Sequence, residues 1–218
     1  ILDIVDTICS YQAASLFHGS ETIDLIPKDL FFEMASPTYK NCVEKVAEKG
    51  WMREEWNSAL LSWCEIPELK MIQNERVEGD PPLALAHCDL WANNLIFGRG
   101  VEGDLHLRAI IDWQCASLGN ALLDVSSVVG INMDAAERRL HETTILEEYV
   151  SNFNEKCAFT NHMSPFTIDL SQAKKCYKRG LKLAAIQLAL ALGTHCDQDK
   201  LEMTLSMRLK SILEDIVE

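Results

Sequence analysis

The residue types and spacings that could carry chemistry are concentrated between residues 87 and 112. The run HCDLWANN at 87–94 places the Asp89 carboxylate and the Asn94 carboxamide five residues apart, and a second carboxylate, Asp112, ends the run IID. Phosphoryl transfer requires such a set, because a carboxylate must orient the attacking hydroxyl or accept its proton while oxygen ligands hold Mg²⁺ against the phosphates. Asp89 fits the first role, and Asn94 and Asp112 fit the second.

Each of these residues, taken singly, is also an ordinary turn former, because Asp and Asn side chains hydrogen-bond to nearby backbone. Their joint spacing beside short apolar runs favours a site over three unrelated turns. Mg²⁺ keeps several waters and takes further ligands from substrate phosphates. A third protein carboxylate is therefore not required.

Short apolar runs must position this set. LALAH at 83–87, NLIFG at 94–98 and the alternating LHLRAIID at 105–112 predict three short strands, with Asp89 on the loop between the first two. The apolar rhythm elsewhere predicts helices over 1–18, 37–49, 51–66, 134–157, 171–192 and 200–217. The predicted fold class is α+β and mainly helical, with one domain over 1–218 and a small β region around 83–112.

Capping signals set the expected helix ends. Ser36 followed by Pro37 predicts a cap and a first helical residue, and Gly50 predicts the end of that helix. Pro67 is expected to end the next helix. Ser171 is expected to cap the long helix that begins there.

The charge balance limits the partners. The chain has 20 basic and 33 acidic residues, a formal net charge of −13, and this field would repel nucleic acid and an anionic membrane surface. The apolar run 181–192 predicts a buried core helix and is too short to cross a bilayer. The N-terminal run ILDIVDTICSYQ lacks the features of a signal peptide, which predicts a cytoplasmic location.

The eight cysteines form no CxxC pair and no Cys/His cluster at zinc-finger spacing, so we expect reduced and mostly buried thiols, with Cys88 unreactive. Trp91 and Trp113 are expected to be wall or core residues, with a cation-binding aromatic box as the alternative. A basic cluster on one predicted helix is expected to be a solvated face, or else a contact for an anionic partner. It comprises Lys174, Lys175, Lys178, Arg179 and Lys182.

The motif H-x-D-x-x-x-x-N, followed 18 residues after its Asn by the Asp of IIDWQ, resembles the catalytic loop and metal-binding Asp of protein-kinase-like enzymes. The longer pattern HCDLWANNLIF, AIIDWQ and GNALLDV resembles the choline-kinase-like (CHK) group related to aminoglycoside phosphotransferases, which includes ecdysteroid-kinase-like and uncharacterised nematode proteins. The opening DIVDTICSYQAASL and the later helical segments resemble that group too. The resemblance implies the C-terminal lobe of a protein-kinase-like fold.

The resemblance also implies a role for each residue of the motif. Asp89 would be the catalytic base, and Asn94 and Asp112 would be the metal ligands. Asp124 matches the Asp that steadies the catalytic loop, and His87 is expected to support the same loop through a hydrogen bond to a backbone carbonyl or to Asp124. The implied cofactors are ATP and Mg²⁺.

This sequence departs from the group's pattern at two positions. Cys88 replaces the usual Gly, which would stiffen the turn without removing a catalytic atom, and Ala121 replaces the common Pro. The resemblance begins after the hinge of the complete enzymes, and no lysine of the preceding residues lies in a strand pattern of the V-A-I-K kind. We therefore expect an incomplete chain without the nucleotide-clamping lobe, and little phosphotransfer by these 218 residues alone.

The expected reaction is transfer of the ATP γ-phosphate to a hydroxyl of a small molecule, either an amino alcohol or a steroid-like alcohol. The alternative is a non-catalytic module, a pseudokinase or a lone C-terminal lobe that binds without turnover. The oligomeric state is left open.

A second motif points elsewhere. GRGVEG at 98–103 matches G-x-G-x-x-G and follows a predicted strand. A dinucleotide-binding fingerprint must open a helix, whereas an alternating strand pattern follows this one. The prediction is a hairpin turn that points away from the site.

Overall fold

The computed structural model describes residues 1–18, 28–101, 103–160, 166–194 and 199–217 as an α+β protein that is mainly helical, which confirms the predicted fold class at this level. Its longest helices are α1 (Leu2–His18), α2 (Lys28–Ala47), α6 (Ala135–Thr160), α7 (Leu170–Thr194) and α8 (Asp199–Val217). Shorter helices are α3 (Glu54–Trp63), α4 (Ile66–Gln73) and α5 (Leu123–Asn132).

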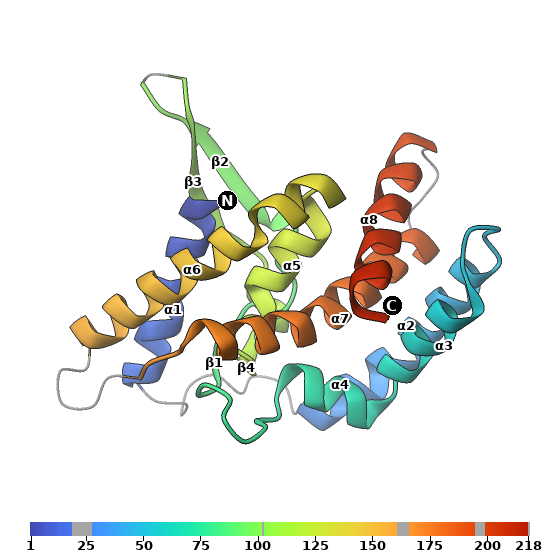
Figure 1. Ribbon diagram of the computed structural model, residues 1–218, viewed down its shortest axis with the longest axis horizontal. Helices are drawn as coiled ribbons and strands as arrows, with labels where there is room; N and C mark the ends of the chain where they lie inside the picture. Colours follow the sequence, from blue (N-terminus) through green and yellow to red (C-terminus); the bar gives the residue numbers. More distant parts are fainter. Residues whose placement is uncertain (19–27, 102, 161–165, 195–198, 218) are drawn as a thin grey trace.

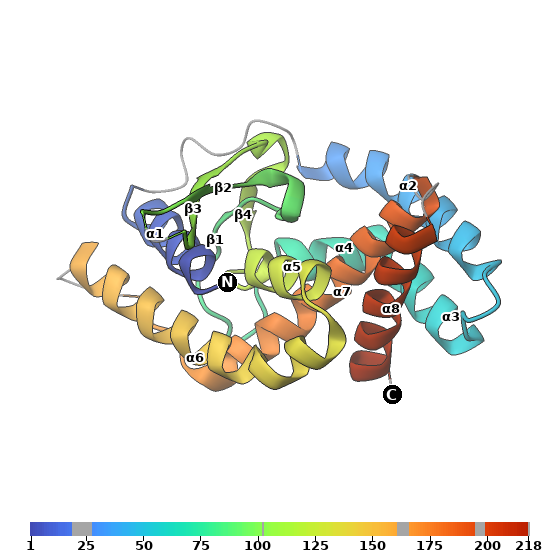
Figure 2. The same ribbon diagram turned by 90° about the horizontal axis from the view of Figure 1, so that it is seen from above.

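Helix α7 lies in the middle of the helical body. It packs against α2, α5 and α8, while α1 and α6 lie side by side at one end of the molecule (Figures 1 and 2). The predicted core run 181–192 is confirmed, because most of its residues are buried in α7. A central helix that is apolar over most of its surface is expected when other helices cover it.

The strands form two small antiparallel sheets. β1 (Ala84–Ala86) pairs with β4 (Ser117–Gly119), and β2 (Leu95–Arg99) pairs with β3 (Leu105–Ile110) in a hairpin that extends from the helical body (Figure 1). The three predicted strands are confirmed within a few residues. The prediction missed β4, because a three-residue strand is too short to show an alternating pattern.

The GRGVEG motif lies in the β2–β3 hairpin, as predicted: Gly98 and Arg99 end β2, and Gly100, Val101 and Gly103 lie between the strands. The Gly100 amide donates to the Asp104 carbonyl at 2.8 Å, and Gly103 has a left-handed φ of 86°. The chain then enters a strand and not a helix, so the motif does not open a helix. This geometry does not suit a dinucleotide pyrophosphate.

Two proline predictions are wrong. Pro37 lies inside α2, which begins at Lys28, and Pro67 lies in the first turn of α4 and does not end a helix. Burial of Phe32 and Ser36 holds the turns before Pro37 in the helix, at the cost of one backbone hydrogen bond. In α4 the proline occupies the one region of a helix where its missing N–H is not needed.

The predicted cap of α7 is also wrong. Asp169 caps this helix: its Oδ1 accepts from the Gln172 amide at 2.8 Å, while Gln172 Oε1 accepts from the Asp169 amide at 2.9 Å. This reciprocal pair is a capping box, which satisfies two otherwise unpaired donors. Ser171 lies inside the first turn. Helix α5 is absent from the prediction because residues 123–131 are all buried and no polar face marks the helical rhythm.

The seven described cysteines are free, and all except Cys115 are buried; Cys196 lies outside the described residues. In the basic cluster, Lys174, Lys175 and Lys178 are exposed, whereas Arg179 forms an ion pair with Asp80 at 2.6 Å. Among the described helices, none combines the length and apolar character that crossing a membrane requires.

The contact between α5 and α7 depends on Gly180. A Cβ at this position would lie 2.7 Å from the Ser126 Cβ. The Ser126 hydroxyl shares its proton between the Leu122 carbonyl at the start of α5 and, across the contact, the Tyr177 carbonyl of α7. The absence of a side chain therefore sets how closely the two helices approach.

We expect Gly180→Ala to lower the free energy of unfolding by about 1–3 kcal/mol, as overpacking does, although alanine is the better helix former. Urea unfolding measures this change. Gly50→Ala is the control, because nothing lies within 4 Å of its added Cβ. Equal effects of the two substitutions would contradict the close contact.

Candidate functional site

The loop between β1 and β2 brings Asp89 and Asn94 together. The Asn94 side-chain nitrogen donates to the Asp89 carbonyl at 2.8 Å and to Asp89 Oδ2 at 3.2 Å. Asn94 is buried at the end of a short 3₁₀ turn over Ala92–Asn94, whereas Asp89 is half-buried. The five-residue spacing in the sequence thus closes a turn, which leaves the carboxamide oxygen as the atom of Asn94 that a cation could bind.

Asp112 joins this pair from the end of β3. The Ile111 amide donates to the Asn94 carbonyl at 3.0 Å, so the residue before Asp112 is hydrogen-bonded to the loop. Asp112 has a left-handed φ of 64° and an exposed side chain, and its charge acts on Asp89. The structure therefore brings together the three residues that the sequence singled out for chemistry.

The electrostatics of the site favour a more basic Asp89. Burial raises the pKa of the Asp89 carboxyl above its usual range, and the Asp112 charge adds to the rise. The His87 ring and the hydrogen bond from Asn94 oppose it. A carboxylate with a raised pKa accepts a proton more readily than an exposed one.

Asp124, in the first turn of α5, is fully buried and accepts hydrogen bonds from the loop. Its Oδ2 accepts from the Tyr11 hydroxyl at 2.5 Å and from the His87 amide at 2.8 Å, and its Oδ1 accepts from the Cys88 amide at 3.0 Å. Burial raises the pKa of Asp124, and these three hydrogen bonds oppose the rise. The carboxylate therefore ties α1, α5 and the loop together.

His87 makes the kind of hydrogen bond expected of a loop-supporting residue. Its Nε2 lies 2.8 Å from the Ile111 carbonyl, and its Nδ1 accepts from the Asp89 amide at 3.3 Å. The ring is buried and packs edge-on against Trp113, with centroids 4.7 Å apart. These contacts join the strand that carries Asp112 to the loop that carries Asp89.

Cys88 adopts a left-handed φ of 64° between these two residues. Burial raises the pKa of its thiol to about 12, and the Asp124 charge adds to this rise, so the group stays protonated. Its carbonyl accepts from Gln187 Nε2 at 2.9 Å. The expected unreactive thiol agrees with this environment, since the thiolate is the nucleophile.

The two tryptophans near the site differ. Trp113 is half-buried and packs edge-on against Tyr11, with centroids 5.1 Å apart, so it is a wall residue. Trp91 is exposed. They do not face each other in any recorded ring contact among the described residues, and the aromatic-box alternative has no geometric support there.

The donor set of the site suits a hard cation. The Asn94 carboxamide oxygen and the Asp112 carboxylate are oxygen ligands, the kind that Mg²⁺ takes when substrate phosphates supply the rest. No group of three or more His, Cys, Asp or Glu side chains within the described part of the chain could hold a metal by itself. A cation here would need further ligands from water or from a bound molecule.

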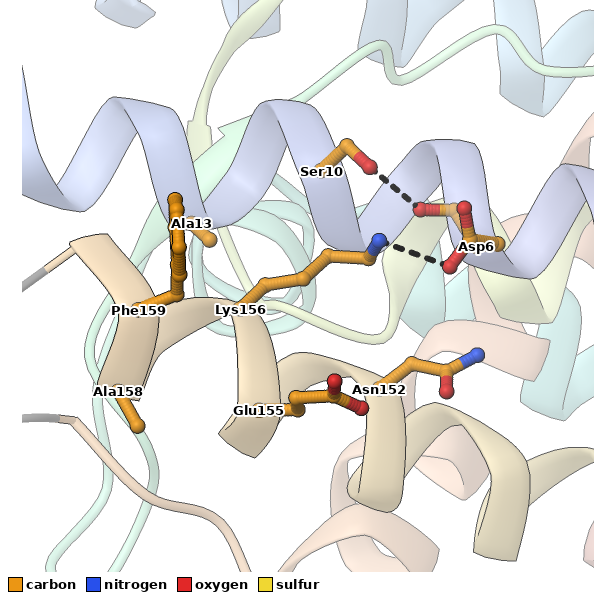
Figure 3. Close-up of a pocket in the computed structure, with 8 residues that line it drawn as sticks. All are labelled: Asp6, Ser10, Ala13, Asn152, Glu155, Lys156, Ala158 and Phe159. Carbon is orange, nitrogen blue, oxygen red and sulfur yellow. Dashed lines mark hydrogen bonds and ion pairs between the residues drawn. The ribbon is translucent and has the colours of Figure 1, made fainter.

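A hollow of about 780 Å³ lies elsewhere, between α1 and α6 (Figure 3). Lys156 and Asp6, which both line this hollow, form an ion pair at 2.8 Å. Ser10, Ala13 and Phe159 are among the other lining residues. It contains none of the residues described above. A separate small hollow beside the site is bounded by Phe31, Phe32, Gln73, Asn74 and residues 114–117.

Sequence reasoning missed Tyr11 and Gln187. No local pattern marks Tyr11, whose partner Asp124 is 113 residues away. Gln187 carried a signal, because it is the one polar residue of the run 183–192. In the structure, the Gln187 side chain donates a hydrogen bond to the Cys88 carbonyl.

Comparison with known proteins gives a family. The DUF1679 model, described as "Uncharacterized oxidoreductase dhs-27", matches residues 1–218, and the chain belongs to this family. The curated protein called uncharacterized oxidoreductase dhs-27, from Caenorhabditis elegans, is 30% identical over 109 residues. That match covers 48% of this chain and only 13% of the relative. No solved structure matches the chain.

Replacement of Cys88 tests the left-handed backbone. We expect Cys88→Gly to be more stable than Cys88→Ala by about 1 kcal/mol, because only glycine adopts a positive φ without strain, although alanine keeps one more buried carbon. Chemical denaturation of both variants measures the difference. Greater stability of the alanine variant would show that residue 88 has an ordinary backbone conformation.

Asp124→Asn tests the buried carboxylate. Its single side-chain oxygen cannot accept on both sides, so one amide of the loop must face an NH₂ group, and we expect a loss of about 3 kcal/mol in unfolding free energy.

The pH dependence of Asp124→Asn has a definite sign. A raised folded-state pKa contributes stability below the ordinary value of 3.8, and that contribution is lost as the pH rises through the folded-state pKa. The difference in unfolding free energy between wild type and Asp124→Asn should therefore decrease with rising pH. Urea titrations from pH 4 to pH 8 measure this difference. An increase with pH would mean that the folded-state pKa of Asp124 is lowered.

Proposed function

We propose that this chain carries the catalytic loop and metal-binding residues of an ATP-dependent small-molecule kinase, and that it corresponds to the C-terminal lobe of a protein-kinase-like fold. The observation that carries the proposal is the pairing of Asp89 with Asn94 on a braced loop, with Asp112 beside it. Isolated turn residues would not need such bracing.

In this proposal Asp89 accepts a hydrogen bond from the substrate hydroxyl, orients its oxygen toward the γ-phosphorus, and takes up its proton as the P–O bond forms and the bond to ADP breaks. Its raised pKa supports that role. Asn94 and Asp112 would hold Mg²⁺, which supplies charge neutralisation at the phosphates when bound. His87 and Asp124 keep the loop in place through the hydrogen bonds described above.

The substrate class is a small-molecule alcohol, with an amino alcohol and a steroid-like alcohol both open. The acidic net charge of −13 favours a cationic alcohol through long-range attraction, and it disfavours nucleic acid and anionic membranes as partners. We further propose a cytoplasmic location, which the free thiols of the seven described cysteines support.

The relative is named an oxidoreductase, but the match covers only 13% of that protein. The G-x-G-x-x-G motif of this chain lies in a hairpin, and both sheets among the described residues are two-stranded and antiparallel. A dinucleotide-binding domain needs a parallel sheet with the motif at a helix N-terminus. These observations favour the kinase proposal over hydride transfer for this segment.

The test uses the longest reading frame that contains this sequence, purified and assayed for ATP consumption with Mg²⁺ against choline, ethanolamine and sterol alcohols. We expect Asp112→Ala to abolish metal-dependent turnover. We expect Asp89→Asn to lower kcat on the order of 10²–10⁴-fold, with the KM for ATP nearly unchanged.

Asp104→Asn is the matched control, because Asp104 is an exposed carboxylate of the hairpin that pairs with His106. It should keep full activity. Wild-type rates in Asp89→Asn and Asp112→Ala would refute the assignment. Binding of an alcohol without ATP consumption by the full reading frame would favour the non-catalytic module.

A further inference from the structure

The peptide that precedes Asp89 is held in an unfavourable conformation. Cys88 has a φ of 64°, in the left-handed region where the Cβ of an ordinary residue approaches the backbone too closely. Only surrounding contacts can maintain such a conformation. Because Asp89 follows directly, these contacts also set where its carboxylate lies.

Both ends of the Cys88 residue are fixed by polar side chains of the helical body. Its amide donates to Asp124 Oδ1 at 3.0 Å, and its carbonyl accepts from Gln187 Nε2 at 2.9 Å. Asp124 comes from α5, and Gln187 comes from the middle of α7. The left-handed residue is therefore held between two core helices.

The side chain of Gln187 has one possible orientation. A carbonyl can only accept, so the amide nitrogen must face Cys88, and the amide oxygen then accepts from the Ser127 hydroxyl at 3.1 Å. Ser127 is itself buried in α5. The carboxamide of Gln187 is thus satisfied at both its nitrogen and its oxygen by this one arrangement.

We propose that Gln187 is a positioning residue for Asp89, acting through the Cys88 carbonyl. This inference rests on the proposed function. Without the bond from Gln187, the Cys88 carbonyl loses its partner and the backbone relaxes toward a negative φ, which moves Asp89 away from Asn94. Gln187 touches neither Asp89 nor a metal ligand in any recorded hydrogen bond among the described residues.

The identity of residue 88 makes the proposal specific. Glycine adopts a positive φ as readily as a negative one, so a glycine at position 88 would keep the loop in place without help from α7. The need for Gln187 thus comes from the side chain of Cys88. Removing both side chains should restore what removing Gln187 alone destroys.

The experiment compares wild type, Gln187→Met, Cys88→Gly and the double variant Cys88→Gly/Gln187→Met. Methionine keeps the length of glutamine and removes both polar atoms. Gln172→Met is the matched control, since Gln172 lies on the same helix and donates to a distant backbone carbonyl, that of Gly79, at 2.7 Å. Ser127→Ala is a milder variant in case Gln187→Met does not fold.

The first readout needs no activity. Backbone chemical shifts of residues 87–89, measured by NMR on the 218-residue chain, report the sign of φ at residue 88. We expect a positive φ in wild type, a shift toward negative φ in Gln187→Met, and a return to positive φ in the double variant. Gln172→Met should match wild type.

The second readout is the broadening of resonances near Asn94 and Asp112 by Mn²⁺, which is added with ATP as a paramagnetic substitute for Mg²⁺. The third readout is the steady-state kinetics of the full reading frame. We expect Gln187→Met to lower kcat about 10- to 100-fold with the KM for ATP little changed, because a catalytic group displaced by about 1 Å costs this much. The double variant should recover most of the loss.

The outcomes separate the two proposals. If φ at residue 88 stays positive in Gln187→Met, or if Cys88→Gly gives no rescue, Gln187 is only a packing residue and the inference is overturned. If the shifts change and recover as expected while Mn²⁺ broadens no resonance near Asn94 and Asp112 in wild type, the positioning role stands and the kinase proposal fails.

Discussion

The Asp124 carboxylate is fully buried at the start of α5 and accepts hydrogen bonds from Tyr11 and from the amides of His87 and Cys88. A buried carboxylate is costly unless such donors surround it, so α5 cannot separate from α1 and the loop, which supply the donors, without a penalty of several kcal/mol. The position of the loop between β1 and β2 relative to α1 and α5 depends on this interaction.

The support continues from Asp124 in two directions. Through His87, the loop is joined to the Ile111 carbonyl and thus to the strand that carries Asp112. Through Gln187, the Cys88 carbonyl is joined to α7, the helix that packs against most of the others. Asp89 is half-buried and Asp112 is exposed, whereas His87 and Asp124, which hold the loop, are buried. Such a division lets a rigid core fix the geometry of groups that must meet a substrate.

Much of the fold and the site could be predicted where a signal is local. The strands around 83–112, the hairpin at GRGVEG and the long helices follow from periodicity and turn chemistry. Pro37 misled the prediction because buried neighbours keep a helix continuous through it. Helix α5 escaped it because a helix buried on all sides has no polar face to set its rhythm.

The sequence by itself determined which residues could do chemistry, because the spacing of Asp89 and Asn94 closes one turn and the strand after it delivers Asp112. Tertiary structure alone decided what holds them. Tyr11 and Gln187 lie 113 and 99 residues from the groups they bind, and no local pattern encodes a contact across that separation. Such partners are selected only when helices pack, since a buried carboxylate or carbonyl must then find a donor within about 3 Å.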